Sequence, residues 1–182
     1  MEKHRKQIRL KNYDYSQSGL YFVTICTENR KRLFGDIVGV GRDRPPLIGR
    51  DRSMPDEPRV SMILNQYGTI VKNVWKSLPD HHSVELDAFQ IMSNHVHFIL
   101  HIVLGASRRA PTTLGTIVGL FKSECTKQIN NVGATRGSPD SKTRGSPKIH
   151  IWQRNYYEHI IRNENELIII REYIKLNPLY HV

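Results

Sequence analysis

Two histidines separated by a single residue are the sharpest chemical feature of the sequence. His95 and His97 flank Val96 in a run of apolar and β-branched residues that is typical of a strand. Because side chains alternate along a strand, both imidazoles point to one face, where together they could hold one divalent cation. His101 shares that face but lies roughly 13 Å from His97 at about 3.3 Å per residue, too far to bind the same ion. The alternative is a pair of solvated surface histidines.

The cysteines do not suggest a second metal site. A structural zinc ion takes four ligands, usually with cysteine among them. Cys26 and Cys125 form neither a Cys-x-x-Cys knuckle nor a disulfide framework, so we expect core or helix residues in a reducing cytoplasm. The sequence also lacks a P-loop and the Gly-x-Gly-x-x-Gly, Gly-x-Ser-x-Gly and His-Glu-x-x-His motifs, which disfavours nucleotide, serine-hydrolase and zinc-protease chemistry.

A tyrosine and an asparagine four residues apart form the second chemical feature. Tyr173 and Asn177 would share one face of a helix. The tyrosine could act as a nucleophile, and the amide oxygen of the asparagine could bind a hard cation. The alternative is a half-buried tyrosine that packs the helix and an asparagine near its C-terminus. Tyr156 and Tyr157 compete with Tyr173 for a nucleophilic role.

The charge of the chain favours a polyanionic partner. The 27 Lys and Arg residues exceed the 17 Asp and Glu residues, for a formal net charge of +10. A surface of that sign suits nucleic acid, although positive charge can also serve solubility alone. Residues 152–162 interleave aromatic residues with Arg154 and Arg162, which could stack on bases and neutralise phosphates. The same segment could equally be a core anchor with solvated charges.

These residues need a scaffold, and apolar periodicity predicts one of mixed type. Strands are predicted at 20–27, across 84–103 as a hairpin, and at 149–152. Helices are predicted at 60–78, closed by Pro79, at 112–130 with Thr113 as N-cap, and at 164–177. Asn163 can cap the last helix, with Glu166 completing a capping box, and Pro178 ends it. This order predicts an α+β fold with helices packed on an antiparallel sheet.

The length of 182 residues suits a single domain spanning 1–182. Two segments, 39–59 and 133–148, lack apolar periodicity and contain the near-repeats GRDRP/GRDRS and TRGSP/TRGSP, so we expect mobile loop insertions there. No apolar run approaches the roughly 20 residues of a membrane span. The basic N-terminus is not followed by an apolar signal core, so a secreted or membrane protein is not expected.

Taken together, these pieces resemble the single-tyrosine HUH transposases, and most closely the REP-associated tyrosine transposases. HUH denotes His, hydrophobic residue, His, here His95-Val96-His97. The order and spacing of several blocks carry the resemblance over most of the chain, namely residues 5–10, 13–16, 21–25, 34–35, 92–100, 121–123, 152–162 and 173–178. The sequence departs from the family at Ser93, where proline is usual, and in its longer Gly/Arg/Ser/Pro segments.

The resemblance implies a ferredoxin-like α+β domain with a specific chemistry. His95 and His97 would hold Mg²⁺ or Mn²⁺, with Asn177 as third ligand where related insertion-sequence transposases often have glutamine. Tyr173 would attack a phosphate of single-stranded DNA beside a hairpin, leaving a 5′-phosphotyrosine link and a free 3′-OH. Arg171 or Lys175 could ease deprotonation of the tyrosine.

The resemblance also implies partners and a location. Phosphate contacts are predicted at Arg5, Arg9, Lys122, Arg154 and Arg162. The protein would act in the prokaryotic cytoplasm at the nucleoid, as a monomer or homodimer, without a nucleotide cofactor. Three alternatives stay open: a domesticated hairpin-binding relative, an RNA-binding α+β module, and a relaxase or rolling-circle initiator, although those usually have larger chains.

Overall fold

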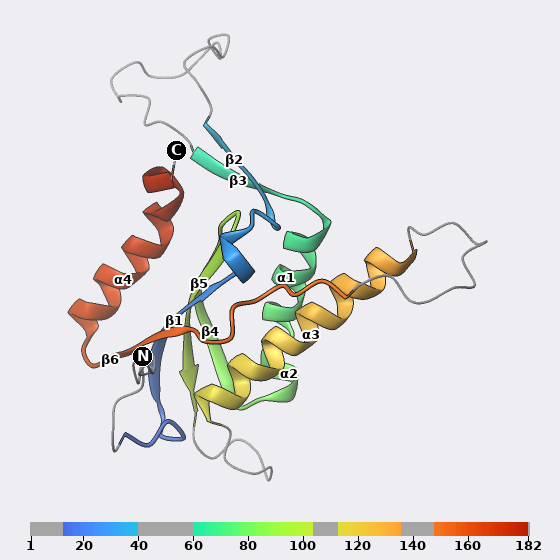
Figure 1. The fold of residues 1–182 in the computed structure, drawn as a ribbon. Helices are drawn as coiled ribbons and strands as arrows, with labels where there is room; N and C mark the ends of the chain where they lie inside the picture. Colours follow the sequence, from blue (N-terminus) through green and yellow to red (C-terminus); the bar gives the residue numbers. More distant parts are fainter. Residues whose placement is uncertain (1–12, 40–59, 104–112, 136–147, 182) are drawn as a thin grey trace, which may run out of the picture.

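A computed structural model describes residues 13–39, 60–103, 113–135 and 148–181 (Figure 1). It contains six strands, four α-helices and two 3-10 helices in these ranges. The strands are β1 (Gly19–Cys26), β2 (Gly35–Gly39), β3 (Val60–Leu64), β4 (Val84–Ile91), β5 (His95–Ile102) and β6 (Tyr157–Ile161). The helices are η1 (Glu28–Arg30), α1 (Gln66–Lys76), α2 (Leu78–His81), α3 (Leu114–Thr135), α4 (Glu164–Leu176) and η2 (Asn177–His181).

The main sheet has four antiparallel strands in the order β4-β5-β1-β6. With α1 between β1 and β4 and α3 between β5 and β6, this is the βαββαβ arrangement of a ferredoxin-like fold. The predicted α+β class is therefore confirmed. Strands β2 and β3 form a separate two-stranded ribbon that Figure 1 draws beyond one end of the main sheet.

Alternation along the strands divides the apolar residues between two faces of the sheet. On one face, Tyr21, Val23 and Ile25 of β1 belong to a large core that α1 and α3 cover. On the other face, Phe22 belongs to a much smaller cluster beneath α4, completed by Ile99, Ile161, Leu167 and Ile174. The molecule therefore has three layers, and α4 is the layer with the smaller apolar attachment.

Two predicted elements differ from the observed ones, and strand β6 was not predicted. Residues 60–64 form β3 rather than the start of a helix, which begins only at Gln66 because Asn65 caps it through the N–H groups of Tyr67 and Gly68. Residues 149–152 form no strand, and only Trp152 makes an isolated bridge, to Thr27. The edge strand is β6, five residues later, in a segment predicted to be an aromatic and basic surface.

The remaining predictions hold with shifted ends. The hairpin of β4 and β5 lies within the predicted 84–103 region, and β1 matches the predicted strand to within a residue. Thr113 caps α3 by accepting from the N–H of Thr116, and α3 extends five residues beyond the predicted end. The predicted loops 39–59 and 133–148 lie mostly outside the described residues, although 133–135 belong to α3. None of the described helices combines the length and apolar character needed to cross a membrane.

Candidate active site

The two histidines begin β5 and lie on the α4 face of the sheet. Each imidazole is nearly buried, with 4% of the residue exposed. The Nε2 atoms of His95 and His97 lie 3.0 Å apart. Both imidazoles therefore point to the same face of the sheet, as strand alternation predicts. Two ring nitrogens that converge in this way could bind one metal ion between them. His101 lies on the same face but bonds to Glu85 at 3.1 Å, so it stands apart as expected.

The far nitrogen of each imidazole has a partner. His95 Nδ1 lies 2.6 Å from the side-chain oxygen of Asn94, and His97 Nδ1 lies 2.8 Å from the hydroxyl of Thr24. An amide oxygen only accepts, so His95 donates from Nδ1 and keeps its lone pair on Nε2. The Thr24 contact follows from register, since Thr24 pairs with His97 across β1 and β5. Such contacts fix the ring orientation that a metal-binding histidine needs.

Tyr173 projects from α4 over this pair. Its ring centroid lies 5.4 Å from that of His97 and 6.0 Å from that of Phe22. The Phe22 ring in turn stacks on His97, with centroids 5.7 Å apart and an interplanar angle of 21°. Although Tyr173 packs against both rings, it remains 44% exposed, so a large substrate can approach its side.

Asn177 is the residue that ends α4, one helical turn beyond Tyr173. Because α4 runs opposite to β5 in Figure 1, this last turn lies toward the His95 end of the strand. Asn177 is only 1% exposed, and its side-chain oxygen accepts no hydrogen bond from any described residue. Burying an unsatisfied amide oxygen is costly unless a ligand satisfies it.

His95, His97 and Asn177 offer two imidazole nitrogens and one amide oxygen, a mixed donor set that could hold one divalent cation. In the described ranges no group of three or more His, Cys, Asp and Glu side chains could hold a metal, so this mixed set is the candidate. Cys125 offers no competing thiolate, because burial within the α1 and α3 layer raises the pKa of its thiol.

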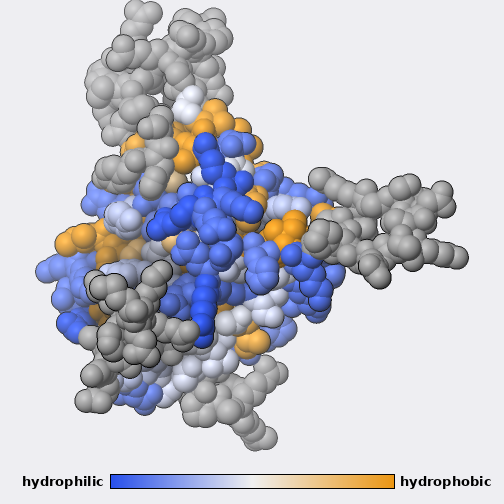
Figure 2. Space-filling model, viewed as in Figure 1, coloured by the Kyte–Doolittle hydropathy of each residue, from blue (hydrophilic) through white to orange (hydrophobic). Residues whose placement is uncertain are grey.

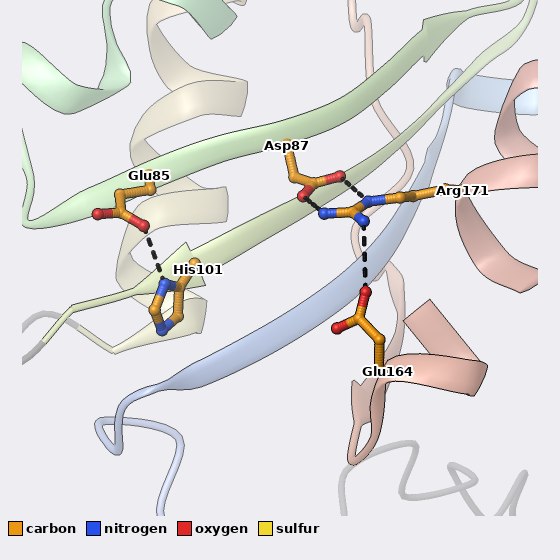
Figure 3. A network of polar contacts seen from close by, with 5 residues as sticks. All are labelled: Glu85, Asp87, His101, Glu164 and Arg171. Carbon is orange, nitrogen blue, oxygen red and sulfur yellow. Dashed lines mark hydrogen bonds and ion pairs between the residues drawn. The ribbon is translucent and has the colours of Figure 1, made fainter. Parts of the chain in front are cut away.

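An ion pair holds α4 against the edge strand of the sheet. Arg171 donates from Nε and Nη2 to the two carboxylate oxygens of Asp87, at 2.9 and 2.5 Å, and lies 3.8 Å from Glu164 (Figure 3). The register of β4 shifts between Leu86 and Phe89, and this bulge carries Asp87. The hydrogen bonds from Arg171 hold the pKa of Asp87 below its ordinary value.

The N-terminus of α4 is also anchored. Asn163 caps the helix by accepting from the N–H of Glu166, as predicted. The Glu166 carboxylate does not return to Asn163 as in a capping box. It accepts from the N–H of Arg162 at 2.8 Å and contacts His159 of β6 at 2.6 Å, which ties the first turn of α4 to the preceding strand.

Of the two predicted helpers of the tyrosine, Arg171 has another partner, and a role for Lys175 stays a prediction. Arg171 and Lys175 are two residues from Tyr173 on either side, and residues at that spacing do not face each other on a helix. Arg171 is engaged with Asp87 instead.

Tyr156 and Tyr157, the other two candidate nucleophiles, lie on opposite faces of the sheet. Tyr156 packs against the large core on the opposite side of the sheet. Tyr157 pairs with Thr24 across β1 and β6 and contacts Phe22, with ring centroids 6.2 Å apart, so it borders the candidate site.

Of the predicted phosphate contacts, Lys122, Arg154 and Arg162 lie among the described residues. Lys122 on α3 donates its ammonium to the backbone carbonyls of Gln153 and Arg154, on the layer opposite the histidines. Burial lowers the pKa of Lys122, consistent with a structural link. Arg154 and Arg162 are exposed, and residues 5 and 9 lie outside the described ranges.

Sequence reasoning missed the side chains that support the site, namely Phe22, Thr24 and Asn94. Two of them lie on β1 and meet His97 only through strand pairing, which local patterns do not reveal. Asn94 carried a usable signal, because it directly precedes the first histidine and asparagine readily bonds to neighbouring groups.

Known proteins resemble this chain along most of its length. The family described as "Transposase IS200 like" matches residues 56–177. An uncharacterised protein of Haemophilus influenzae is 34% identical over 193 residues, covering 97% of this chain and 89% of that protein. A second protein of the same organism, which carries the name of a REP-associated tyrosine transposase, is 23% identical over 174 residues, covering 94% of this chain and 78% of its own.

One solved structure supports the fold. It is described as a REP-associated tyrosine transposase bound to a REP hairpin. It matches with a TM-score of 0.53 at 18% identity, over 100% of this chain and 74% of that one.

Proposed function

The chain belongs to the IS200-like transposase family, and on that premise we propose that it is a metal-dependent endonuclease and strand transferase of single-stranded DNA. The reaction proceeds through a 5′-phosphotyrosine intermediate on Tyr173, at or near a hairpin. One observation carries the proposal. Two imidazole Nε2 atoms converge at 3.0 Å beside a half-exposed tyrosine that packs on one of the same rings.

The residues that would hold the metal are His95, His97 and Asn177. The unpartnered, buried amide oxygen of Asn177 supports this assignment, since a cation would satisfy it. A divalent cation held by these residues would supply Lewis-acid polarisation of the scissile phosphate and would stabilise the charge that develops on it.

Tyr173 supplies the nucleophile. Its phenolic oxygen attacks phosphorus, the bond from phosphorus to the 3′-oxygen breaks, and the departing oxygen takes up a proton as the phenol loses one. The phosphodiester bond energy is kept in the phosphotyrosine link, so the 3′-OH of a second strand can reverse the step and join. The stacked Phe22 and His97 rings hold the phenol at the site by packing.

The substrate class follows from relatives and from charge. The solved structure of the REP-associated transposase is bound to a hairpin, and a net charge of +10 suits a DNA strand. We propose that residues 1–182 form one catalytic domain that acts on nucleoid DNA in the cytoplasm, as a monomer or homodimer.

A covalent-adduct assay tests this function. The protein is incubated with Mn²⁺ or Mg²⁺ and labelled single-stranded hairpin DNA from its own genomic flanks, then denatured and resolved on a gel. We expect a metal-dependent adduct that is absent from Tyr173→Phe and His95→Ala and present in the matched control Tyr157→Phe. An adduct that survives Tyr173→Phe contradicts the assignment of the nucleophile. Hairpin binding without any adduct favours a domesticated DNA-binding relative.

A further inference from the structure

A shallow cleft of roughly 590 Å³ lies beside η1, at the end of β1. Two segments far apart in the sequence form its walls, and the lining residues are Glu28, Asn29, Lys31, Lys148, Ile149 and His150. We call this the η1 cleft. None of these residues belongs to the candidate metal set or to the predicted phosphate contacts.

Backbone hydrogen bonds fix the two walls to each other. The N–H of Glu28 donates to the carbonyl of Ile151 at 2.8 Å, and Thr27 bridges to Trp152. The second wall is also held from α3, because Asn130 accepts from the N–H of Ile149 at 2.7 Å and donates to its carbonyl at 3.2 Å. The cleft is therefore a built feature of the fold.

The charge of the cleft is positive. Lys31 and Lys148 are exposed, and no hydrogen bond or ion pair to a described residue engages either ammonium. The one acidic lining residue, Glu28, lies close enough to Lys122 to act on its pKa, so its charge is partly offset. Arg30 and Arg32 are exposed on either side of Lys31. Figure 2 shows strongly hydrophilic residues gathered over the region where Figure 1 draws the end of β1.

The turn that presents these residues has an unusual backbone. Asn29 and Arg30 adopt φ angles of 52° and 54°, in the left-handed region that non-glycine residues seldom occupy. The Thr27 hydroxyl oxygen lies 2.7 Å from the carbonyl oxygen of Lys31 and 2.9 Å from that of Asn94, so its single proton can be donated to either and tie the turn to the neighbouring strand. Strain retained in this way is typical of functional segments.

The η1 cleft and the histidine pair lie at the same end of the sheet. Cys26, the last residue of β1, pairs with His95. Asn94 connects the two places directly, because its Oδ1 contacts His95 at 2.6 Å while its Nδ2 donates to the carbonyl of Arg30 at 3.4 Å. A DNA strand whose scissile phosphate lies at the histidines can therefore pass over η1.

We propose that the η1 cleft binds backbone phosphates of the substrate strand on one side of the cleavage position, through Lys31 and Lys148. Ammonium groups neutralise phosphates without reading bases, so this contact is independent of DNA sequence. The inference rests on the proposed function for the identity of the strand, but the cleft can be tested without cleavage.

The test measures binding of labelled oligo(dT) by fluorescence anisotropy, without divalent metal, over a series of salt concentrations. The variant is Lys31→Ala/Lys148→Ala, and the matched control is Lys72→Ala/Lys76→Ala, which removes two exposed lysines from α1. We expect the cleft variant to bind more weakly. The slope of log affinity against log salt should fall in magnitude by about 1.4, since each phosphate contact on a single strand contributes about 0.7. The control should keep the wild-type slope.

Single-stranded oligonucleotides from the genomic flanks, shortened from either side of the position at which wild type forms its adduct, locate the contact. The difference between wild type and the cleft variant should vanish when one flank is removed and persist when the other is removed. An unchanged slope in the cleft variant, or an equal fall in the control, would overturn the proposal. A wild-type protein that binds as expected but forms no adduct would contradict the proposed function and leave the cleft assignment standing.

Discussion

The chemistry proposed for His95 and His97 depends on the atoms behind them. A neutral imidazole offers one lone pair, and the hydrogen bond at Nδ1 decides which nitrogen has it. Asn94 fixes this choice for His95, and Thr24 orients His97 from the neighbouring strand. We propose that both act as positioning residues, so that their removal should lower metal affinity more than it lowers the free energy of unfolding.

Removing the Asn94 side chain tests this at the residue scale. We expect Asn94→Ala to raise the Mn²⁺ concentration needed for half-maximal adduct formation by about 10- to 100-fold. This is the usual loss of metal affinity when the partner behind a metal-binding histidine is removed. Asn94→Asp keeps an acceptor for His95 Nδ1 and should restore most of the affinity. Asn73→Ala, an exposed asparagine on α1, serves as control. Equal Mn²⁺ dependence in Asn94→Ala and wild type would contradict the assignment.

The candidate site could be predicted from the sequence only where its residues are neighbours in sequence. The His-x-His spacing fixed a shared face, and the Tyr173 to Asn177 spacing fixed a shared turn. Phe22 and Thr24 could not be assigned, because their contact with His97 depends on the register between β1 and β5. Lys122 was assigned to phosphate on charge alone, whereas its ammonium holds two carbonyls.

At the scale of elements, the attachment of α4 to the sheet has the largest effect on the candidate site, since this helix carries Tyr173 and ends at Asn177. Its apolar contact is small, and the Asp87–Arg171 pair adds a directional attachment at the opposite edge from β6. An exposed ion pair contributes little to stability, under about 1 kcal/mol. Its effect on positioning can be larger, because a 1 Å misplacement can cost about 10²-fold in rate.

A charge exchange separates positioning from stability. We expect Asp87→Ala to slow adduct formation by about tenfold or more, while the melting temperature falls by no more than about 4 °C. Asp87→Arg/Arg171→Asp should recover part of the rate, because the pair is restored in reverse. Single-turnover kinetics and thermal unfolding measure the two quantities. A rate loss that merely parallels unfolding, with no recovery in the exchange variant, would count against a positioning role.

The contribution of the Asp87–Arg171 pair to the free energy of unfolding should depend on pH. Because the folded-state pKa of Asp87 is lowered, its contribution to stability is complete above the unfolded value of about 4 and is lost as pH falls through the folded value. The difference in unfolding free energy between wild type and Asp87→Asn should be constant from neutral pH to about 5 and shrink in more acidic solution. Urea unfolding at a series of pH values measures it. A difference in unfolding free energy that grows on acidification would contradict a lowered pKa of Asp87 in the folded state.

The β2–β3 ribbon lies next to the end of α4, because β3 contacts η2, which begins at Asn177. A strained glycine in this ribbon allows its contribution to stability to be tested. Gly35 adopts a φ of 136°, and a Cβ there would lie 2.0 Å from the carbonyl oxygen of Ile63. We expect Gly35→Ala to destabilise the protein by at least about 1–3 kcal/mol through backbone strain. Gly39→Ala, where no atom lies within 4 Å of the added Cβ, is the control. Equal unfolding free energies for the two variants would exclude this strain.

Elements were predicted where apolar periodicity is long and caps are present, as in α3, α4 and the β4–β5 hairpin. Strand β6 was missed because its residues Tyr157–Ile161 mix charge with aromatic and apolar character at a sheet edge, where alternation is weak. Residues 60–64 have spacings compatible with a helix, but Asn65 sets a helix start that separates them. Pairing with β2 then makes them a strand.

At the scale of the whole molecule, the two faces of the sheet differ in how much apolar core they carry. The face under α1 and α3 holds most of the core, which leaves the opposite face available for the proposed chemistry. Both histidines and the tyrosine lie on the thinly covered face, and the η1 cleft lies at the same end of the sheet, with its second wall held by α3. A net charge of +10 would draw a DNA strand to such a surface.

The most direct test of the central claim is to identify the residue that becomes joined to DNA. The adduct formed with hairpin DNA and Mn²⁺ is digested with nuclease and trypsin, and the peptides are examined by mass spectrometry. Cleavage after Arg171 and Lys175 releases Tyr173 on one peptide, while Tyr156 and Tyr157 lie together on another that ends at Arg162. We expect the residual nucleotide on the Tyr173 peptide. A nucleotide found only on the Tyr156/Tyr157 peptide would contradict the account.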